Sequence, residues 1–339
     1  MIEVQRPQPV STNLNDLSSL LTGLILLVSL GLLVAGGELL VGAASRLAGR
    51  MGISSLVVGL TVVAFGTSAP ELGVALSSVY QGASDIGVGN IVGSNIFNIL
   101  FIMGAAAVVA PLSVESRLIK VELPLMVGAS GIMWWFASSE TISRGEGGLL
   151  FLMLVIYVTV CIRVARKEPH ESQKQYSDPH EPGQSRQRSV WLDLAVLVAG
   201  FALLVFGSRW LVDAAVTLAK SFGVSDSIIG LTIVALGTSL PEVVTSVVAS
   251  YRGHRDIAVG NVVGSNLFNI GSVLGLCAAV SPSGLPVAES VLRVDLPVMF
   301  FVALLCLPIF LTGRVVSRVE GFLLLGLMTG YWGWLIATG

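Results

Sequence analysis

Residues 66–98 read GTSAPELGVALSSVYQGASDIGVGNIVGSNIFN, and residues 237–269 read GTSLPEVVTSVVASYRGHRDIAVGNVVGSNLFN. The two stretches align without a gap at a constant offset of 171 residues. The same register extends backward through matched pairs such as Leu33 with Leu204. The chain therefore contains two copies of one unit, and each copy includes the segment that precedes its motif.

The composition around these motifs is that of a membrane protein. Hydrophobic residues make up 54% of the 339 residues and charged residues 12%, about half the charged fraction of a soluble domain. A bilayer core needs roughly 20 apolar residues per helical span, and the alternating pattern of a barrel strand is absent. We predict an all-α protein with ten transmembrane helices, near residues 17–45, 53–80, 86–110, 118–138, 146–166, 191–214, 225–251, 257–280, 291–312 and 317–338.

The repeat divides the chain into two halves of five spans each. We expect a polar N-terminal tail at 1–16, the first repeat at 17–166, a cytoplasmic linker at 167–190 and the second repeat at 191–339. The linker is rich in Pro, Gln, Ser and charge, as flexible connections are. An odd number of spans makes the second copy enter the membrane from the opposite side, so we predict the inverted-topology repeats of secondary transporters.

The distribution of basic residues predicts the orientation. Cytoplasmic loops carry the excess of Lys and Arg. With the N-terminus outside, 14 of the 19 Lys and Arg residues fall in inside loops and four in outside segments, while Arg209 lies within a span. We therefore predict both termini outside, in a bacterial inner (plasma) membrane. The basic residues form no single patch, so a nucleic-acid partner is not expected, and no obligatory protein partner is inferred.

Two acidic residues lie where a charge is costly. Glu71 and Glu242 are near the middle of spans two and seven, and a carboxylate at this depth indicates a functional site. Each follows a proline, and Pro also removes a helical hydrogen bond. We predict broken helices at the central site, with the breaks at Gly66, Pro70, Gly237 and Pro241. Carbonyls near Ala64 and Ala235 are expected to be freed as ligands.

Uncharged oxygen donors recur around the two glutamates. Each break adds two hydroxyls, from Thr67 and Ser68 in one half and from Thr238 and Ser239 in the other. The second motif adds further side chains in both halves, namely Asn90, Ser94, Asn95 and Asn98, and Asn261, Ser265, Asn266 and Asn269. Calcium prefers six to eight oxygen ligands, and no His, Cys or Met cluster favours a soft metal. Hard cations are the expected ligands.

These motifs resemble those of the calcium/cation antiporter superfamily, and the chain is similar to its bacterial sodium/calcium exchanger family. The G-T-S-x-P-E and G-N-x-V-G-S-N-x-F-N elements, each present twice, carry the resemblance over all ten spans. The resemblance implies that calcium and sodium compete for one mid-membrane site and that spans one and six move to alternate access. By position, the implied ligands are Glu71, Glu242, Thr67, Ser68, Thr238, Ser239, Ser94, Asn98, Ser265 and Asn269, with the carbonyls of Ala64 and Ala235.

One position departs from the family pattern. Many members carry an aspartate at the end of the second motif, where this chain has Asn269, symmetric with Asn98. Two central carboxylates therefore remain instead of three, which bears on the number of sodium ions exchanged.

The sequence leaves other functions open. The nearest is a cation/proton exchanger of the same superfamily, in which one buried glutamate carries the proton. A passive cation channel is more distant. An intramembrane serine hydrolase would need a base near Ser68 or Ser239, but His170, His180 and His254 all lie in predicted loops. We therefore expect no enzyme and no cofactor, only transported ions.

Overall fold

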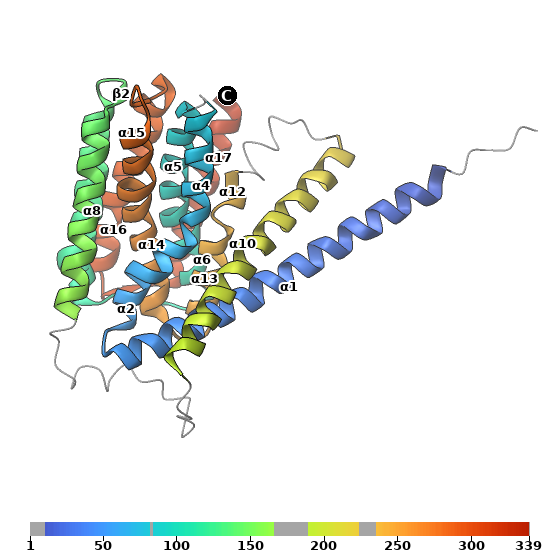
Figure 1. The fold of residues 1–339 in the computed structure, drawn as a ribbon, viewed down its shortest axis with the longest axis horizontal. Coiled ribbons are helices and arrows are strands. Elements are labelled where there is room, and N and C mark those ends of the chain that lie inside the picture. The colour runs from blue at the N-terminus through green and yellow to red at the C-terminus, as the bar shows by residue number, and fades with distance from the viewer. Residues whose placement is uncertain (1–10, 82–83, 166–188, 224–234, 339) are drawn as a thin grey trace, which may run out of the picture.

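The computed structural model describes residues 11–81, 84–165, 189–223 and 235–338. The start of the predicted tail, nearly all of the linker and the first half of the span at 225–251 lie outside these residues. The described part consists of helices with four short strands (Figure 1). Seven of its helices are long and apolar enough to cross a membrane, and a bent pair forms an eighth crossing if it is counted as one.

The first half of the chain follows the predicted spans closely. Its elements are α1 (Ser11–Met51), α2 (Ser55–Val58), η1 (Gly59–Val63), α3 (Ala64–Thr67), α4 (Ala69–Tyr80), α5 (Ser84–Phe97), η2 (Asn98–Met103), α6 (Gly104–Val109), β1 (Leu112–Ser113), η3 (Leu118–Glu122), α7 (Leu123–Ala137), β2 (Thr141–Ile142) and α8 (Arg144–Ala165). Segments labelled η are π-helical turns within longer helices. Helix α1 begins six residues before the predicted span, because 11–16 contain no Gly or Pro to stop its extension.

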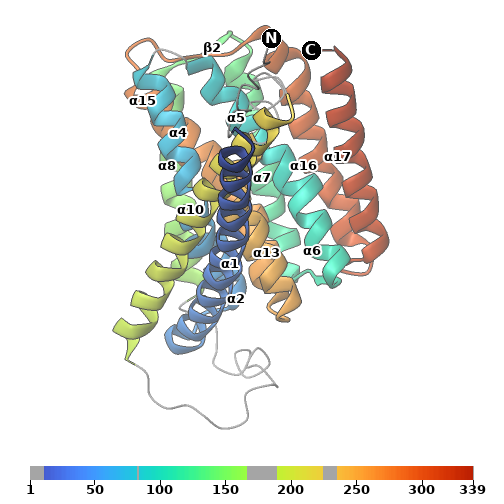
Figure 2. The same ribbon diagram turned by 90° about the vertical axis from the view of Figure 1, so that its right-hand side faces the viewer.

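The second half repeats this order. Its elements are α10 (Val190–Ser221), α12 (Ala235–Gly237), α13 (Leu240–Tyr251), α14 (Arg255–Phe268), η6 (Asn269–Leu274), α15 (Gly275–Val280), β3 (Leu285–Pro286), η7 (Val291–Asp295), α16 (Leu296–Leu311), β4 (Val315–Val316) and α17 (Arg318–Thr338). Helix α1 begins and α17 ends at the same end of the molecule (Figure 2). Both π-helical turns η2 and η6 begin at the last Asn of the second motif, and such turns are frequent at functional sites.

The two helices that carry the second motif form the centre of the bundle. In the spans at 87–109 and 255–280, 78% and 89% of the most apolar stretch is buried, against 22–39% in the other five. A close helix contact supports this position. A methyl group on Gly264 would lie 2.7 Å from the carbonyl oxygen of Leu60, and one on Gly260 would lie 2.9 Å from that of Leu56. Small residues are therefore required where α14 meets α2 and η1.

The strands join the two halves of the chain. Strand β1 pairs antiparallel with β4, and β2 pairs antiparallel with β3. In repeat order, β1 corresponds to β3 and β2 to β4, so each pairing is the counterpart of the other. The halves are thus connected by exchanged contacts at the ends of the bundle as well as at its centre.

Helices α1 and α10 form a pair that lies at an angle across the rest of the bundle (Figures 1 and 2). Their backbones touch, because a methyl group on Gly200 would lie 2.8 Å from the amide nitrogen of Leu40. At one end, the buried carboxylate of Asp193 accepts a 2.9 Å hydrogen bond from Nε of Arg46 and lies 3.3 Å from Nη2 of Arg50. Glycine packing and this ion-pair cluster hold the two helices together.

Candidate ion-binding site

Both predicted helix breaks occur beside the predicted glutamates. Helix α3 ends at Thr67, Ser68 is non-helical, and α4 begins at Ala69 with a bend of 40° between the two parts. In the second half α12 ends at Gly237 and α13 begins at Leu240. Pro70 and Pro241 occupy the first turn of the new helix, where a missing N–H costs nothing. Glu71 and Glu242 follow them in the first turn, favoured there by the helix dipole.

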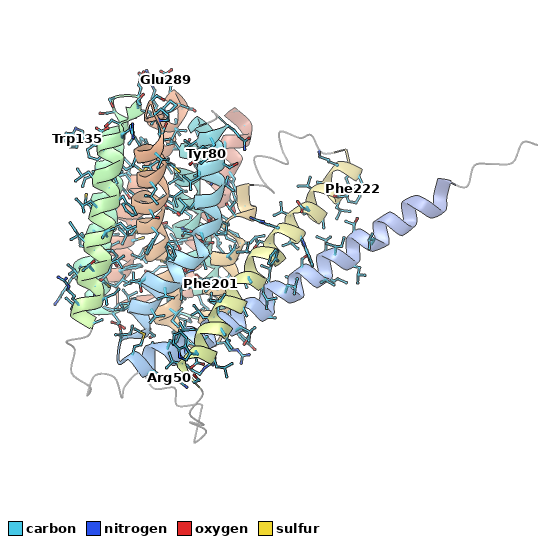
Figure 3. All side chains as sticks on the ribbon, viewed as in Figure 1. Arg50, Tyr80, Trp135, Phe201, Phe222 and Glu289 are labelled. Carbon is cyan, nitrogen blue, oxygen red and sulfur yellow. The ribbon has the colours of Figure 1, made fainter. Side chains whose placement is uncertain are left out.

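The glycines of the two breaks have a packing role. A methyl group on Gly66 would lie 2.0 Å from Cζ of Phe201, and one on Gly237 would lie 2.4 Å from Cγ2 of Val212. Phe201 and Val212 both belong to α10, which therefore crosses both breaks. Figure 3 shows Phe201 on α10 where this helix passes the bundle.

Each glutamate is bonded to the break of the other half. Oγ of Ser68 donates a 3.3 Å hydrogen bond to Oε1 of Glu242, and Oγ of Ser239 donates a 3.1 Å bond to Oε1 of Glu71. All four side chains are buried, with at most 3% exposed. Among the described residues, neither Oε2 atom has a hydrogen-bonding partner. The two halves therefore meet at a pair of buried carboxyl groups, each with one oxygen available.

Most of the remaining candidate side chains are buried and contact other polar groups. Oγ of Ser239 also lies 3.4 Å from Oγ of Ser94. The buried Asn98 and Asn269 donate from Nδ2 to Asn266 and Asn95, at 3.0 and 3.1 Å. Within the described part of the chain, several buried oxygens of the candidates lack a partner: Oδ1 of Asn98 and of Asn269, Oγ1 of Thr238 and Oγ of Ser265. Buried polar atoms are normally satisfied, so this set has the chemistry of a cation site.

One expectation, a freed carbonyl at Ala64, differs from the geometry. The carbonyl of Ala64 accepts a hydrogen bond from the amide of Ser68 at 3.0 Å, so the break does not free it from the helix. The reason is that Pro70 removes the bond to the residue four positions earlier, which is Gly66. The carbonyl oxygen of Ala64 has a second lone pair for a cation, because the one proton of Oγ1 of Thr67, which lies 3.4 Å away, is directed to the closer Asn261. In the second half, the amide of Ser239 donates to the carbonyl of Leu236, 3.2 Å away, and not to that of Ala235 four residues earlier, so the expectation for Ala235 stays a prediction.

Other polar groups support the site without belonging to the predicted ligands. Oδ1 of Asn261 accepts from Oγ1 of Thr67 at 3.1 Å, and its Nδ2 donates to Oγ of Ser246 at 2.9 Å. Nδ2 of Asn95 and of Asn266 donates to the thioether sulfurs of Met299 and Met126. The sequence could have indicated these two methionines. Residues 122–126 (ELPLM) and 295–299 (DLPVM) continue the repeat at an offset of 173, so Met126 and Met299 occupy equivalent positions.

A cavity reaches this site from one direction. Its volume is about 590 Å³, and it lies between α4 and α10, lined by Pro70, Ser77, Arg209, Thr238 and Pro241 among others. Figure 3 shows Tyr80 at the end of α4 and Phe222 at the end of α10, on the two sides of this separation. The cavity thus connects the break at Thr238 with the outside of the bundle.

The opposite direction is closed. A methyl group on Gly37 of α1 would lie 3.0 Å from Cγ1 of Val244 in α13. Next to this contact, the guanidinium of Arg252 is paired with the carboxylate of Glu38. In repeat order, Glu38 corresponds to Arg209, which lines the cavity. Helix α10 is therefore separated from α4 by the cavity at one end, while at the opposite end its partner helix α1 contacts α13.

The model of the sodium/calcium exchanger protein family matches residues 21–163 and 192–337, which cover both halves of the chain. This chain belongs to the sodium/calcium exchanger family. It is a membrane antiporter of cations rather than an enzyme.

Relatives of this exchanger extend over nearly its full length. The putative antiporter CaxA of Alkalimonas amylolytica is 37% identical over 92% of this chain and 98% of its own length. The sodium/calcium exchanger MaX1 of Methanosarcina acetivorans is 34% identical over 89% of this chain and 95% of its own. The inner membrane protein YrbG of Escherichia coli is 40% identical, over 85% and 89%.

A solved structure has the same fold as this exchanger. The sodium-calcium exchanger NCX_Mj superimposes with a TM-score of 0.79 and 29% identity, over 95% of this chain and 99% of that one. The arrangement of helices around the two glutamates is thus that of a known exchanger.

Proposed function

We propose that this chain exchanges calcium for sodium by alternating access, with Glu71 and Glu242 binding the transported ion together. One observation carries this proposal: each buried carboxyl group accepts a hydrogen bond from the break of the other half and keeps a second oxygen without a partner among the described residues. Two carboxylates balance the charge of one Ca²⁺. They also offer the hard oxygen ligands that Ca²⁺ and Na⁺ share.

The full ligand set that we propose is the one implied by the repeat. It comprises Glu71, Glu242, Thr67, Ser68, Thr238, Ser239, Ser94, Asn98, Ser265 and Asn269, with the carbonyls of Ala64 and Ala235. Six buried oxygens of this set have no hydrogen-bonding partner in the described ranges, and six is the lower end of calcium coordination. The serine hydroxyls donate to one oxygen of each carboxylate and so leave the other for the cation.

The proposed topology has ten spans in two inverted repeats, with both termini outside. Reciprocal contacts support the inverted repeats: Ser68 with Glu242 is matched by Ser239 with Glu71, and β1 with β4 is matched by β3 with β2. Such exchanged contacts indicate a two-fold relation between the halves, and five spans in each half place its axis in the membrane plane. The excess of basic residues in the loops supports the orientation. In this orientation the cavity between α4 and α10 opens to the outside.

The proposed movement is a shift of α1 and α10 as one unit against the rest of the bundle. Their backbone contacts at Gly200 and the ion pairs of Asp193 support a common movement. Closing the cavity beside α4 would require α10 to approach α4, and the α1 contact with α13 at Gly37 would then open. Ions then reach the carboxylates by one route at a time. Calcium transport is coupled to the return of sodium because two buried carboxylates without a cation oppose the change of conformation.

Radioactive calcium uptake into proteoliposomes tests this function. An outward sodium gradient should drive uptake, an outward proton gradient should not, and Glu71→Gln and Glu242→Gln should each abolish uptake. Glu289→Gln is the matched control, because Glu289 is an exposed glutamate. Uptake driven only by protons would indicate the related cation/proton exchanger, and full uptake in both site variants would refute the site assignment.

A further inference from the structure

Four asparagines and two methionines form two matching hydrogen-bonded chains beside the candidate ligands. In the first, Nδ2 of Asn269 donates to Oδ1 of Asn95 at 3.1 Å, and Nδ2 of Asn95 donates to Sδ of Met299 at 3.6 Å. In the second, Nδ2 of Asn98 donates to Oδ1 of Asn266 at 3.0 Å, and Nδ2 of Asn266 donates to Sδ of Met126 at 3.5 Å. The four asparagine side chains are at most 2% exposed.

The sulfur atoms give each chain its direction. A thioether sulfur is a weak acceptor and never a donor, whereas an amide side chain is a donor at one end and an acceptor at the other. Met299 can therefore be satisfied only by Nδ2 of Asn95, which turns Oδ1 of Asn95 toward Asn269. Among the described residues, that oxygen accepts its hydrogen bond from Nδ2 of Asn269. The last atom of the chain, Oδ1 of Asn269, has no hydrogen-bonding partner in the described part of the molecule.

We propose that Asn95 and Asn266 are positioning residues, which hold the amides of Asn269 and Asn98 with oxygen rather than nitrogen toward the transported cation. This inference rests on the proposed function. An amide rotated by 180° would present Nδ2 to a cation, and an N–H donor repels a positive charge. An aspartate at 269 has two equivalent oxygens and needs no such orientation. The chain from Met299 thus explains how a neutral side chain serves at Asn269.

Removing the acceptor tests the inference. Asn95→Leu keeps the number and branching of the side-chain heavy atoms but cannot accept from Asn269, so the amide is free to turn. We expect a loss of calcium affinity of about tenfold, the effect of one hydrogen bond to an ion-binding group, with little change in the maximal rate. The measurements are equilibrium binding of radioactive calcium and the dependence of sodium-driven uptake on calcium concentration.

A second substitution, Asn269→Asp, distinguishes a positioning role of Asn95 from a packing role. In the Asn269→Asp background, Asn95→Leu should change calcium affinity by less than about twofold, because a carboxylate presents oxygen in either orientation. A purely structural role of Asn95 would give the same loss in both backgrounds and would overturn the inference. The equivalent substitutions in the second hydrogen-bonded chain, Asn266→Leu with and without Asn98→Asp, should have the same effects on calcium affinity.

A milder variant keeps the inference testable if Asn95→Leu fails to fold. Met299→Leu conserves volume and removes only the sulfur acceptor, so we expect about a threefold loss of affinity that Asn269→Asp again removes. Unchanged affinity in Met299→Leu and in Asn95→Leu would contradict the inference. Calcium binding by the unmodified protein without sodium-driven uptake would contradict the proposed function and leave the positioning role intact.

Discussion

Oγ of Ser239 lies 3.1 Å from Oε1 of Glu71 and donates a hydrogen bond to it across the boundary between the two halves of the chain. The counterpart bond, from Ser68 to Glu242, has a length of 3.3 Å. Neither half can thus build its carboxylate site alone. The first motif of each copy supplies a glutamate for its own half and a serine for the other half.

The two serines should contribute similarly to ion binding. Ser239→Ala or Ser68→Ala removes one hydrogen bond to a carboxylate, and such bonds contribute about 1.5–3 kcal/mol. We expect calcium affinity to fall by about tenfold or more in either variant, as measured by equilibrium binding. Ser78→Ala is the control, because its hydroxyl bonds only to the carbonyl of Val74 in its own helix. Equal affinity in all three variants would contradict the cross-bonded arrangement.

The cavity predicts which positions a reagent can reach. In vesicles of known orientation, a membrane-impermeant thiol reagent should label Ser77→Cys and Thr238→Cys from the side of the chain termini, since both positions line the cavity. Ser239→Cys, one residue further and 1% exposed, should react far more slowly. The native Cys161, Cys277 and Cys306 are buried and should give little background. Labelling from the linker side alone would contradict the proposed orientation.

The ion pair between Glu38 and Arg252 should favour the conformation described above. Its side chains are 33% and 54% exposed, so solvent screening keeps its contribution small. Glu38→Gln should therefore lower the labelling rate of Ser77→Cys by up to about fivefold, because the cavity is open less of the time. Glu289→Gln breaks an exposed pair with Arg293 instead and should leave the rate unchanged. A faster rate in Glu38→Gln would be inconsistent with the assigned role.

The packing of α1 against α10 should depend on glycine at the positions where the two backbones touch. A methyl group on Gly200 would lie 2.8 Å from the nitrogen of Leu40, so Gly200→Ala should destabilise the protein by about 1–3 kcal/mol. Gly31→Ala, on the partner helix α1, meets no described atom within 4 Å and should have no destabilising effect. The melting temperature in detergent compares the two variants. A lower value for Gly31→Ala than for Gly200→Ala would contradict the packing.

Much of this arrangement could be predicted from the repeat. The glutamates, the break residues and most helix boundaries follow from apolar run length, proline chemistry and the 171-residue register. The orientation of the asparagine amides could not be predicted, because it depends on Met126 and Met299, which match only after the register shifts by two residues. The pairing of Glu38 with Arg252 joins helices 214 residues apart in sequence, and no local pattern predicts it. The hydrogen bond from Ser68 to the carbonyl of Ala64 could not be predicted from the proline, because Pro70 removes the bond to Gly66 and leaves the preceding turn intact.

Equilibrium binding of radioactive calcium to the purified protein tests the central claim most directly. If Glu71 and Glu242 bind one ion together, Glu71→Gln and Glu242→Gln should each remove nearly all calcium binding, and sodium should compete with calcium in the unmodified protein. The contrary result is that each single variant retains about half of the bound calcium and only the double variant loses the rest. The two halves would then contain separate sites, which would contradict the binding of one ion by both glutamates.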